Sequence, residues 1–195
     1  FEARDSDLID SKSGVSARMS ITIMQNLVSS AERRMIINNE KETSIRMSDF
    51  NSVISSINGK VELVYEGEEE GAEQVSYNLI SDAVKSIFNK IFPKIEKLSK
   101  PDEVTPYDSI LAWFSKKQLV INDDLNNKDY EKLLNEIKDV KIIIDKYVNK
   151  LDVNDEFFYI EFLLWGLEGY NKLSILRTNN GVEFKDPFNN FINKI

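Results

Sequence analysis

The chain of 195 residues contains no cysteine and no histidine. The usual nitrogen and sulfur ligands of zinc and iron–sulfur sites are therefore missing, and so is a thiol nucleophile. Histidine is also the side chain most often used as a general base. Any chemistry must use Asp, Glu, Lys, Arg, Tyr or Ser, and the lack of cysteine fits a reducing compartment.

Glycine and proline are scarce, with 7 and 4 residues respectively. Few turn-forming residues, together with long apolar patterns that repeat every three or four positions, are typical of helices. We therefore expect an all-α fold. Short extended pieces are expected at most near residues 60–66 and 182–185, and residues 60–67 are also compatible with an irregular helical turn.

Basic residues are outnumbered by acidic ones, 25 against 33, which gives a formal net charge of -8. An acidic surface repels the phosphate backbone, so nucleic-acid binding is disfavoured. The most apolar run, residues 157–167, is too short to span a bilayer and contains Glu161. We expect a soluble, cytoplasmic protein that binds no membrane. Because the first residue is Phe1 and not Met, we also expect a piece of a longer protein.

Two long helices are expected in the first half, over residues 17–37 and 75–92. In the first of them the spacing predicts an inward face of Ile23, Met24, Leu27, Val28, Ala31 and Met35. In the second half the spacing predicts one long helix that carries inward residues from Tyr130 to Leu151. A further, central helix is expected to begin near Asn154.

Proline-rich sequence divides the chain into two expected helical domains. Pro101 and Pro106 lie close together, so we expect a first domain over residues 1–98, a linker over 99–104 and a second domain over 105–195. Thr105, Pro106 and Asp108 form a pattern typical of a capped helix start.

One arginine lies at an unusual place in the stretch SKSGVSARMSI, residues 11–21. Gly14 permits a tight turn, Ser16 can cap the following helix, and Arg18 falls in its first turn. The helix dipole disfavours a positive side chain there, but free N–H groups and a guanidinium together suit a phosphate. On spacing alone, however, an exposed surface arginine is the favoured interpretation of Arg18, with the phosphate-binding interpretation as the alternative.

Other candidates have simpler structural explanations. Five glutamates fall within residues 66–73, a pattern compatible with a magnesium site or a basic partner, but a solvated helix start is favoured. Arg33 and Arg34 suit the end of a helix, and we expect pairing with Glu32 or Glu40. Trp113, Phe114 and Trp165 are expected in the core. No metal site is predicted.

Several segments, in the same order, carry a family resemblance: SGVSARMSI, NLVSSAERR, RMSD at residues 46–49, GKVELVYEGEEEG and AVKSIFNKIFP. Together they resemble the C-terminal part of AAA+ ATPases of the magnesium-chelatase I-subunit-like and MoxR-like group. The resemblance covers roughly residues 3–93. Residues 113–130 and 167–186 also look similar to the C-terminal extension of longer bacterial members.

The resemblance implies that an α/β ATPase core with the Walker motifs precedes this chain, which would be the helical lid and an extension. Arg18 matches the family's sensor-2 arginine, which reaches the γ-phosphate of ATP, with Gly14 and Ser16 as supporting turn and cap. ATP and magnesium are then ligands of the intact protein, and no cofactor is expected in this fragment. The fragment has no GxxxxGK[ST] loop, so alone it is not expected to be catalytic.

The partners that the resemblance implies are the chain's own N-terminal core, neighbouring subunits of a ring, commonly a hexamer, and a von Willebrand A-domain protein to be remodelled. It does not imply porphyrin chelation. The alternative function is a stand-alone helical adaptor, in which the acidic run and the second bundle bind a protein partner and nucleotide has no role.

Overall fold

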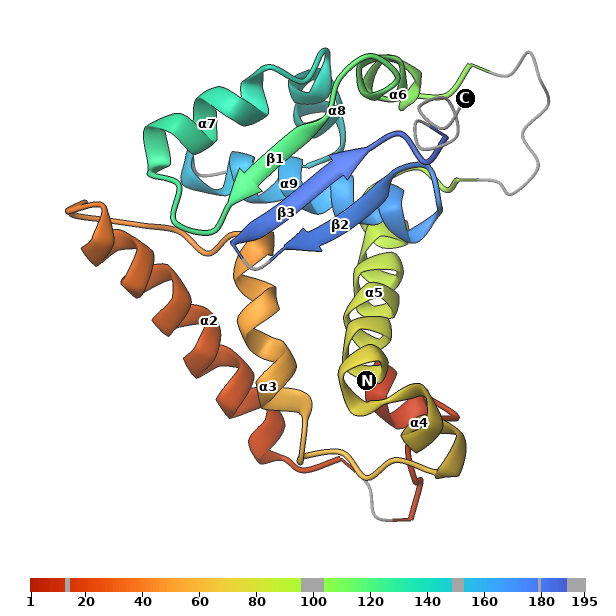
Figure 1. Ribbon diagram of the computed structural model, residues 1–195. Coiled ribbons are helices and arrows are strands. Elements are labelled where there is room, and N and C mark those ends of the chain that lie inside the picture. The colour runs from red at the N-terminus through yellow and green to blue at the C-terminus, as the bar shows by residue number, and fades with distance from the viewer. Residues whose placement is uncertain (13–14, 96–103, 149–152, 179, 189–195) are drawn as a thin grey trace, which may run out of the picture.

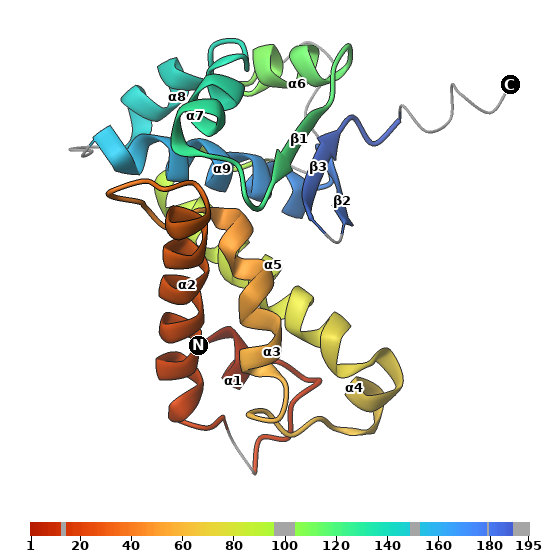
Figure 2. The same cartoon turned by 60° about the vertical axis from the view of Figure 1, so that its left-hand side comes forward.

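The structure is a computed structural model that describes residues 1–12, 15–95, 104–148, 153–178 and 180–188. Two arms of helices from the first half of the chain extend from a second half that is built of helices and one small sheet (Figures 1 and 2). The elements of the first half are α1 (Glu2–Asp5), α2 (Arg18–Ile37), the 3-10 helix η1 (Met47–Val53), α3 (Ile54–Ile57), α4 (Tyr65–Glu70) and α5 (Ala72–Ile91).

The two long helices predicted in the first half are confirmed as α2 and α5. Fewer apolar side chains of α2 are buried than the inward face predicted from the sequence contains. Leu27 and Ala31 are buried, whereas Met24 and Val28 are 56% and 41% exposed, so the prediction was wrong for these two side chains. The packed face is centred on the side that meets η1 and α3, which leaves the neighbouring apolar stripe uncovered.

Residues 60–67 turn out to contain both of the predicted conformations. Val61 and Leu63 form isolated antiparallel bridges with Val15 and Ile9, and Tyr65 then begins α4. The extended part therefore ties the segment that precedes α2 to the segment that precedes α4.

The second half contains α6 (Asp108–Phe114), β1 (Leu119–Asn122), α7 (Asn127–Asn135), α8 (Val140–Tyr147), α9 (Val153–Gly169), β2 (Ser174–Thr178) and β3 (Gly181–Lys185). The three strands form an antiparallel sheet in the order β1-β3-β2, with Leu119 and Ile175 each opposite Phe184. The chain is mostly helical but belongs to the α+β class, so the all-α prediction was wrong for the sheet.

Strands β1 and β2 escaped prediction because they are only four and five residues long, too short for a two-residue alternation to stand out. The extended piece expected at 182–185 is part of β3, where Val182 and Phe184 are buried. Its partners β1 and β2 were missed. Asn180–Gly181, which begins the return strand of a hairpin, was the available signal.

The single long helix expected from Tyr130 onward is two helices, α7 and α8. Between them Asp139 adopts a left-handed conformation with φ of 59°, which interrupts the helix. Ile137 and Val140 are both buried on either side of this break. Apolar residues therefore continue at helical spacing while the backbone changes direction, which is why the pattern did not reveal the turn.

Helix α9 is central, as predicted, and it packs on α5 through a close crossing at Gly166. A Cβ atom placed on Gly166 would lie 2.0 Å from Cδ2 of Phe88. Phe114 and Trp165 are buried as expected, and Trp113 is half-buried. The buried apolar residues of both halves form one continuous cluster. The predicted linker lies almost wholly in residues 96–103, outside the described residues. After it, the backbone N–H and the hydroxyl of Thr105 donate to the carboxylate of Asp108, but Tyr107 is the N-cap and α6 begins at Asp108, so the helix start predicted at Thr105 and Pro106 was wrong.

Candidate functional site

Arg18 is the first residue of α2, and its side chain is exposed. Among the residues that the structure describes, no hydrogen bond or ion pair involves its guanidinium. All five N–H donors of that group therefore face solvent and are available to an anion. An arginine in this state can bind a phosphate through two parallel hydrogen bonds.

Ser16 holds the start of α2 in place. Its backbone N–H donates to the carbonyl of Lys60 at 3.1 Å, and its own carbonyl accepts from the N–H of Met19 at 2.9 Å. Its Oγ accepts from the N–H of Arg18 at 3.3 Å, which is a local form of the capping that the sequence suggests, although Ala17 occupies the N-cap position. Gly14 lies outside the described residues.

These contacts show which hydrogen-bond donors at the start of α2 are already used and so are not available to an anion. Two backbone N–H groups of the first turn, those of Arg18 and Met19, already bond Ser16. The guanidinium of Arg18 therefore adds donors that no described residue uses at this corner. The bridge between Val15 and Val61 fixes the approach to it, so the position of Arg18 depends on the segment that leads into α4.

The five glutamates of residues 66–73 lie on α4 and the start of α5, and all are exposed. Within the described ranges, no group of three or more Asp or Glu side chains is arranged to hold a metal ion. The acidic run is thus a solvated surface at the end of the α5 arm (Figure 1).

The sequence suggested that Arg33 and Arg34 pair with Glu32 or Glu40. Among the described residues, their partners are two aspartates instead. Arg33 forms a surface ion pair with Asp124 at 2.7 Å. Arg34 is 1% exposed and its Nη1 donates to Asp49 Oδ1 at 2.5 Å, while its Nη2 donates to the carbonyl of Ser44 at 2.7 Å. The far end of α2 is therefore anchored in the interior by Arg34, an arginine that was expected near the end of the helix but with a different partner.

A second buried arginine joins this region to the second half of the chain. Arg46 stacks on the ring of Tyr130, with its Cζ 3.9 Å from the ring centroid, and donates to the carbonyl of Leu125 at 2.7 Å. Its backbone N–H donates to Asp49 Oδ2 at 2.8 Å. Asp49 thus connects Arg34 of α2 to Arg46, whose side chain packs on Tyr130 of α7.

Glu161 of α9 completes this group and is fully buried. Its Oε2 accepts from the hydroxyl of Tyr130 at 2.7 Å and from the backbone N–H of Met47 at 3.1 Å. We call Arg34, Arg46, Asp49, Tyr130 and Glu161 the buried polar cluster.

Burial changes the acid–base properties of the buried polar cluster. It raises the pKa of Glu161 to about 7, with the charge of Asp49 adding to the effect and the Tyr130 hydroxyl opposing it. Burial and the neighbouring Arg34 lower the pKa of Arg46 to about 10. The pKa of Tyr130 is raised well above its ordinary 10, mainly by burial and, to a smaller extent, by the negative charge and hydrogen bond of Glu161. Near pH 7, Arg46 is therefore charged, Tyr130 is neutral and Glu161 is divided between its two forms.

Sequence reasoning missed the buried polar cluster because its members are far apart along the chain. Tyr130 and Glu161, for example, are 31 positions apart, and Met47, whose backbone also bonds Glu161, lies 114 positions before it. One local signal was present: Glu161 interrupts the most apolar run of the chain, and a carboxyl group in such a run is buried with partners or not at all.

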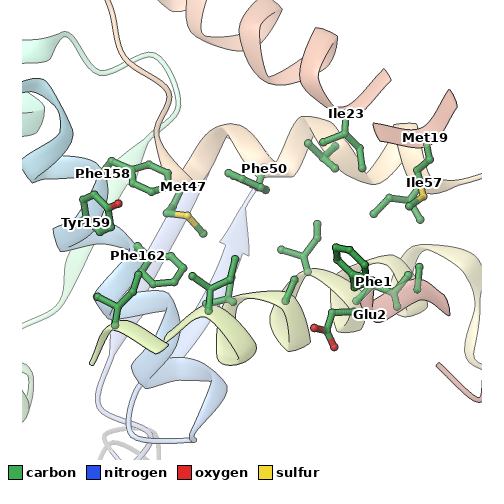
Figure 3. Close-up of a pocket in the computed structure, with 18 residues that line it drawn as sticks. Phe1, Glu2, Met19, Ile23, Met47, Phe50, Ile57, Phe158, Tyr159 and Phe162 are labelled. Carbon is green, nitrogen blue, oxygen red and sulfur yellow. The ribbon is translucent and has the colours of Figure 1, made fainter. Parts of the chain in front are cut away.

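An apolar cavity of about 320 Å³ lies between the two arms of the first half. Met19, Ile23, Phe50 and Ile57 line one wall, α5 lines the other, and Phe162 lies at the end formed by α9 (Figure 3). Among the described residues, Glu2 is the charged side chain that lines it. Its volume is at the lower end of the usual range for ligand sites, and its walls suit apolar groups.

Comparison of the chain with protein-family models, with curated proteins and with solved structures finds no match in any of the three. Across the described residues, no helix has both the length and the apolar character needed to cross a membrane.

Proposed function

We propose that this chain is the sensor-2 lid and C-terminal extension of an AAA+ ATPase of the magnesium-chelatase I-subunit-like and MoxR-like group. The observation that carries the proposal is Arg18, an exposed arginine with unengaged donors at the first turn of a long helix, inside the SGVSARMSI motif. A surface arginine needs no such motif and no fixed helix start, whereas a phosphate sensor needs both.

The residues of the Arg18 corner fit a phosphate. The guanidinium supplies charge and paired donors, and Ser16 fixes the first turn through backbone bonds to Lys60 and Met19. In the intact protein the γ-phosphate of ATP would be held by Arg18, and magnesium by the core domain with the Walker motifs. Arg18 then stabilises the negative charge at the triphosphate.

Helix α2 offers a path from this corner to the rest of the chain. Arg18 and Arg34 are sixteen residues apart on one helix, which corresponds to about 24 Å at the usual rise of 1.5 Å per residue. Arg34 is fixed by Asp49 and Ser44. A movement of α2 on loss of the γ-phosphate would therefore reach the buried polar cluster, and through it α7 and α9.

The partners that follow from this proposal are the chain's own ATPase core, neighbouring subunits of a hexameric ring and a protein to be remodelled, such as one with a von Willebrand A domain. A second candidate function is a stand-alone adaptor that binds a protein partner without nucleotide. The apolar cavity and the exposed Met24 and Val28 favour it, because uncovered apolar surface marks interaction sites.

The test is ATP turnover by the full-length protein that contains this chain. Arg18→Ala should reduce kcat by a factor of roughly a hundred or more, because arginines that stabilise charge at a transferred phosphate contribute on that scale. Arg4→Ala is the matched control, since Arg4 is an exposed arginine on a short helix of the same half. It should leave the rate unchanged.

Circular dichroism on both variants separates loss of chemistry from loss of fold, since both substitutions are at exposed positions. An Arg18→Ala protein that folds and hydrolyses ATP at the wild-type rate would reject the sensor role. Retention of partner binding without nucleotide would then favour the adaptor function.

A further inference from the structure

Glu161 lies where three segments of the chain meet. It belongs to α9, it bonds the backbone of Met47 at the start of η1, and it bonds Tyr130 of α7. It is fully buried, and both of these bonds use the same oxygen, Oε2. One carboxyl group thus connects the first half of the chain to two helices of the second half.

The other carboxyl oxygen, Oε1, is buried and has no hydrogen-bond partner among the described residues. An ionised carboxylate spreads its charge over both oxygens, so an unpartnered one in the interior is costly. A neutral carboxylic acid carries no such charge and is tolerated better. The complete burial of the carboxyl group therefore favours the protonated form of Glu161, while the two donors on Oε2 oppose it and favour the ionised form.

The charged and titratable groups that act on the carboxyl of Glu161 come from the segment around η1 and from α7. They are Arg46 and Asp49 from the segment that forms η1, and Tyr130 from α7, with Arg34 of α2 behind them. Arg46 directs its Nη groups to Leu125 and Asn127 and not to Glu161. Asp49 adds a like charge. From the part of the chain that the structure describes, the ionised form of Glu161 would receive two hydrogen bonds and no direct salt bridge.

We propose that Glu161 is a pH-sensitive clasp that holds η1 against α7 and α9 when its carboxyl is protonated and loosens when it ionises. The device needs no nucleotide and no other domain. It therefore goes beyond the proposed function and stands or falls separately from it.

Proton linkage determines whether a rise in pH strengthens or weakens the clasp. Burial raises the pKa of Glu161 from an ordinary 4.5 to about 7, so the closed clasp binds a proton that the opened, solvated carboxyl releases. Between these two values the opened state is favoured more strongly as the pH rises. The clasp is firm below pH 4.5, weakens steadily up to about pH 7 and changes little above it.

The linkage also gives the size of the effect. With pKa values of 4.5 and about 7, the equilibrium constant for local opening increases about tenfold between pH 6 and pH 8. Arg46 and Tyr130 do not titrate in this interval, because the pKa of Arg46 is about 10 and burial raises the pKa of Tyr130 well above its ordinary 10.

Amide hydrogen exchange of residues 46–53, measured from pH 6 to pH 8, tests the clasp directly. After division by the intrinsic exchange rates, the protection of this segment in the wild-type protein should fall about tenfold. Glu161→Gln keeps the shape and an acceptor for both bonds but cannot ionise, so its protection should not change with pH. Glu131→Gln, at an exposed position on α7, should behave like the wild type.

Tyr130→Phe provides a second variant that keeps the ring under Arg46 and removes the hydroxyl donor. That donor favours the ionised carboxyl, so its loss should raise the pKa of Glu161 further. The fall in protection should then still begin near pH 4.5, but its upper end should be displaced to above pH 7 and the fall between pH 6 and pH 8 should become larger. Wild-type protection that is constant with pH would overturn the proposal. So would an equal fall in Glu161→Gln, or no displacement of the fall in Tyr130→Phe.

Discussion

Two adjacent arginines show how strongly the position on a helix decides the role of a residue. Arg33 and Arg34 follow each other on α2, yet the first is 61% exposed in its side chain and the second is 1% exposed. Each has an aspartate partner, Asp124 and Asp49 respectively. Only the buried pair shares its carboxylate with further donors, the backbone N–H of Arg46 and the hydroxyl of Ser30.

This contrast leads to a prediction about stability. Asp49→Ala leaves the buried guanidinium of Arg34 without its counter-charge and should lower the free energy of unfolding by about 3–5 kcal/mol. Asp124→Ala removes only a surface pair and should cost about 1 kcal/mol or less. Urea denaturation of both variants measures the difference. Equal losses would mean that the buried pair contributes no more than an exposed one.

At the level of elements, helical periodicity was enough to predict α2, α5 and the central α9. It could not reveal the break between α7 and α8, because buried residues continue on both sides of Asp139. It could not reveal a sheet whose strands are four and five residues long. The site shows the same limit: the motif around Arg18 is local and could be predicted, whereas Arg46 and Glu161 are brought together only by folding.

The crossing of α5 and α9 gives a prediction at this scale. A Cβ at Gly166 would overlap the buried ring of Phe88, so Gly166→Ala should force the two helices apart and cost about 1–3 kcal/mol or more. Gly169→Ala is the control, because its Cβ would meet the side chain of Lys85, at 2.9 Å from Cγ, and a lysine side chain can move. Thermal unfolding should separate the two variants; similar melting temperatures would argue against a tight crossing.

In the molecule as a whole, α2 is the feature that relates the candidate site to the rest of the chain. Its first turn presents Arg18 to solvent, and its last turn is fixed by Arg34 inside the buried polar cluster. The apolar core runs without interruption from the first half of the chain into the second. A displacement of α2 would therefore act on a packed interior, which is compatible with the lid role proposed above.

The central claim is that Arg18 contacts the γ-phosphate, and nucleotide discrimination tests it most directly. In the full-length protein, the ratio of affinities for the slowly hydrolysed analogue ATPγS and for ADP is measured by calorimetry, with and without Arg18→Ala. The loss of a charge-assisted hydrogen bond worth about 1.5–3 kcal/mol should lower this ratio roughly tenfold or more, while the affinity for ADP stays unchanged. An unchanged ratio in the variant would contradict the account.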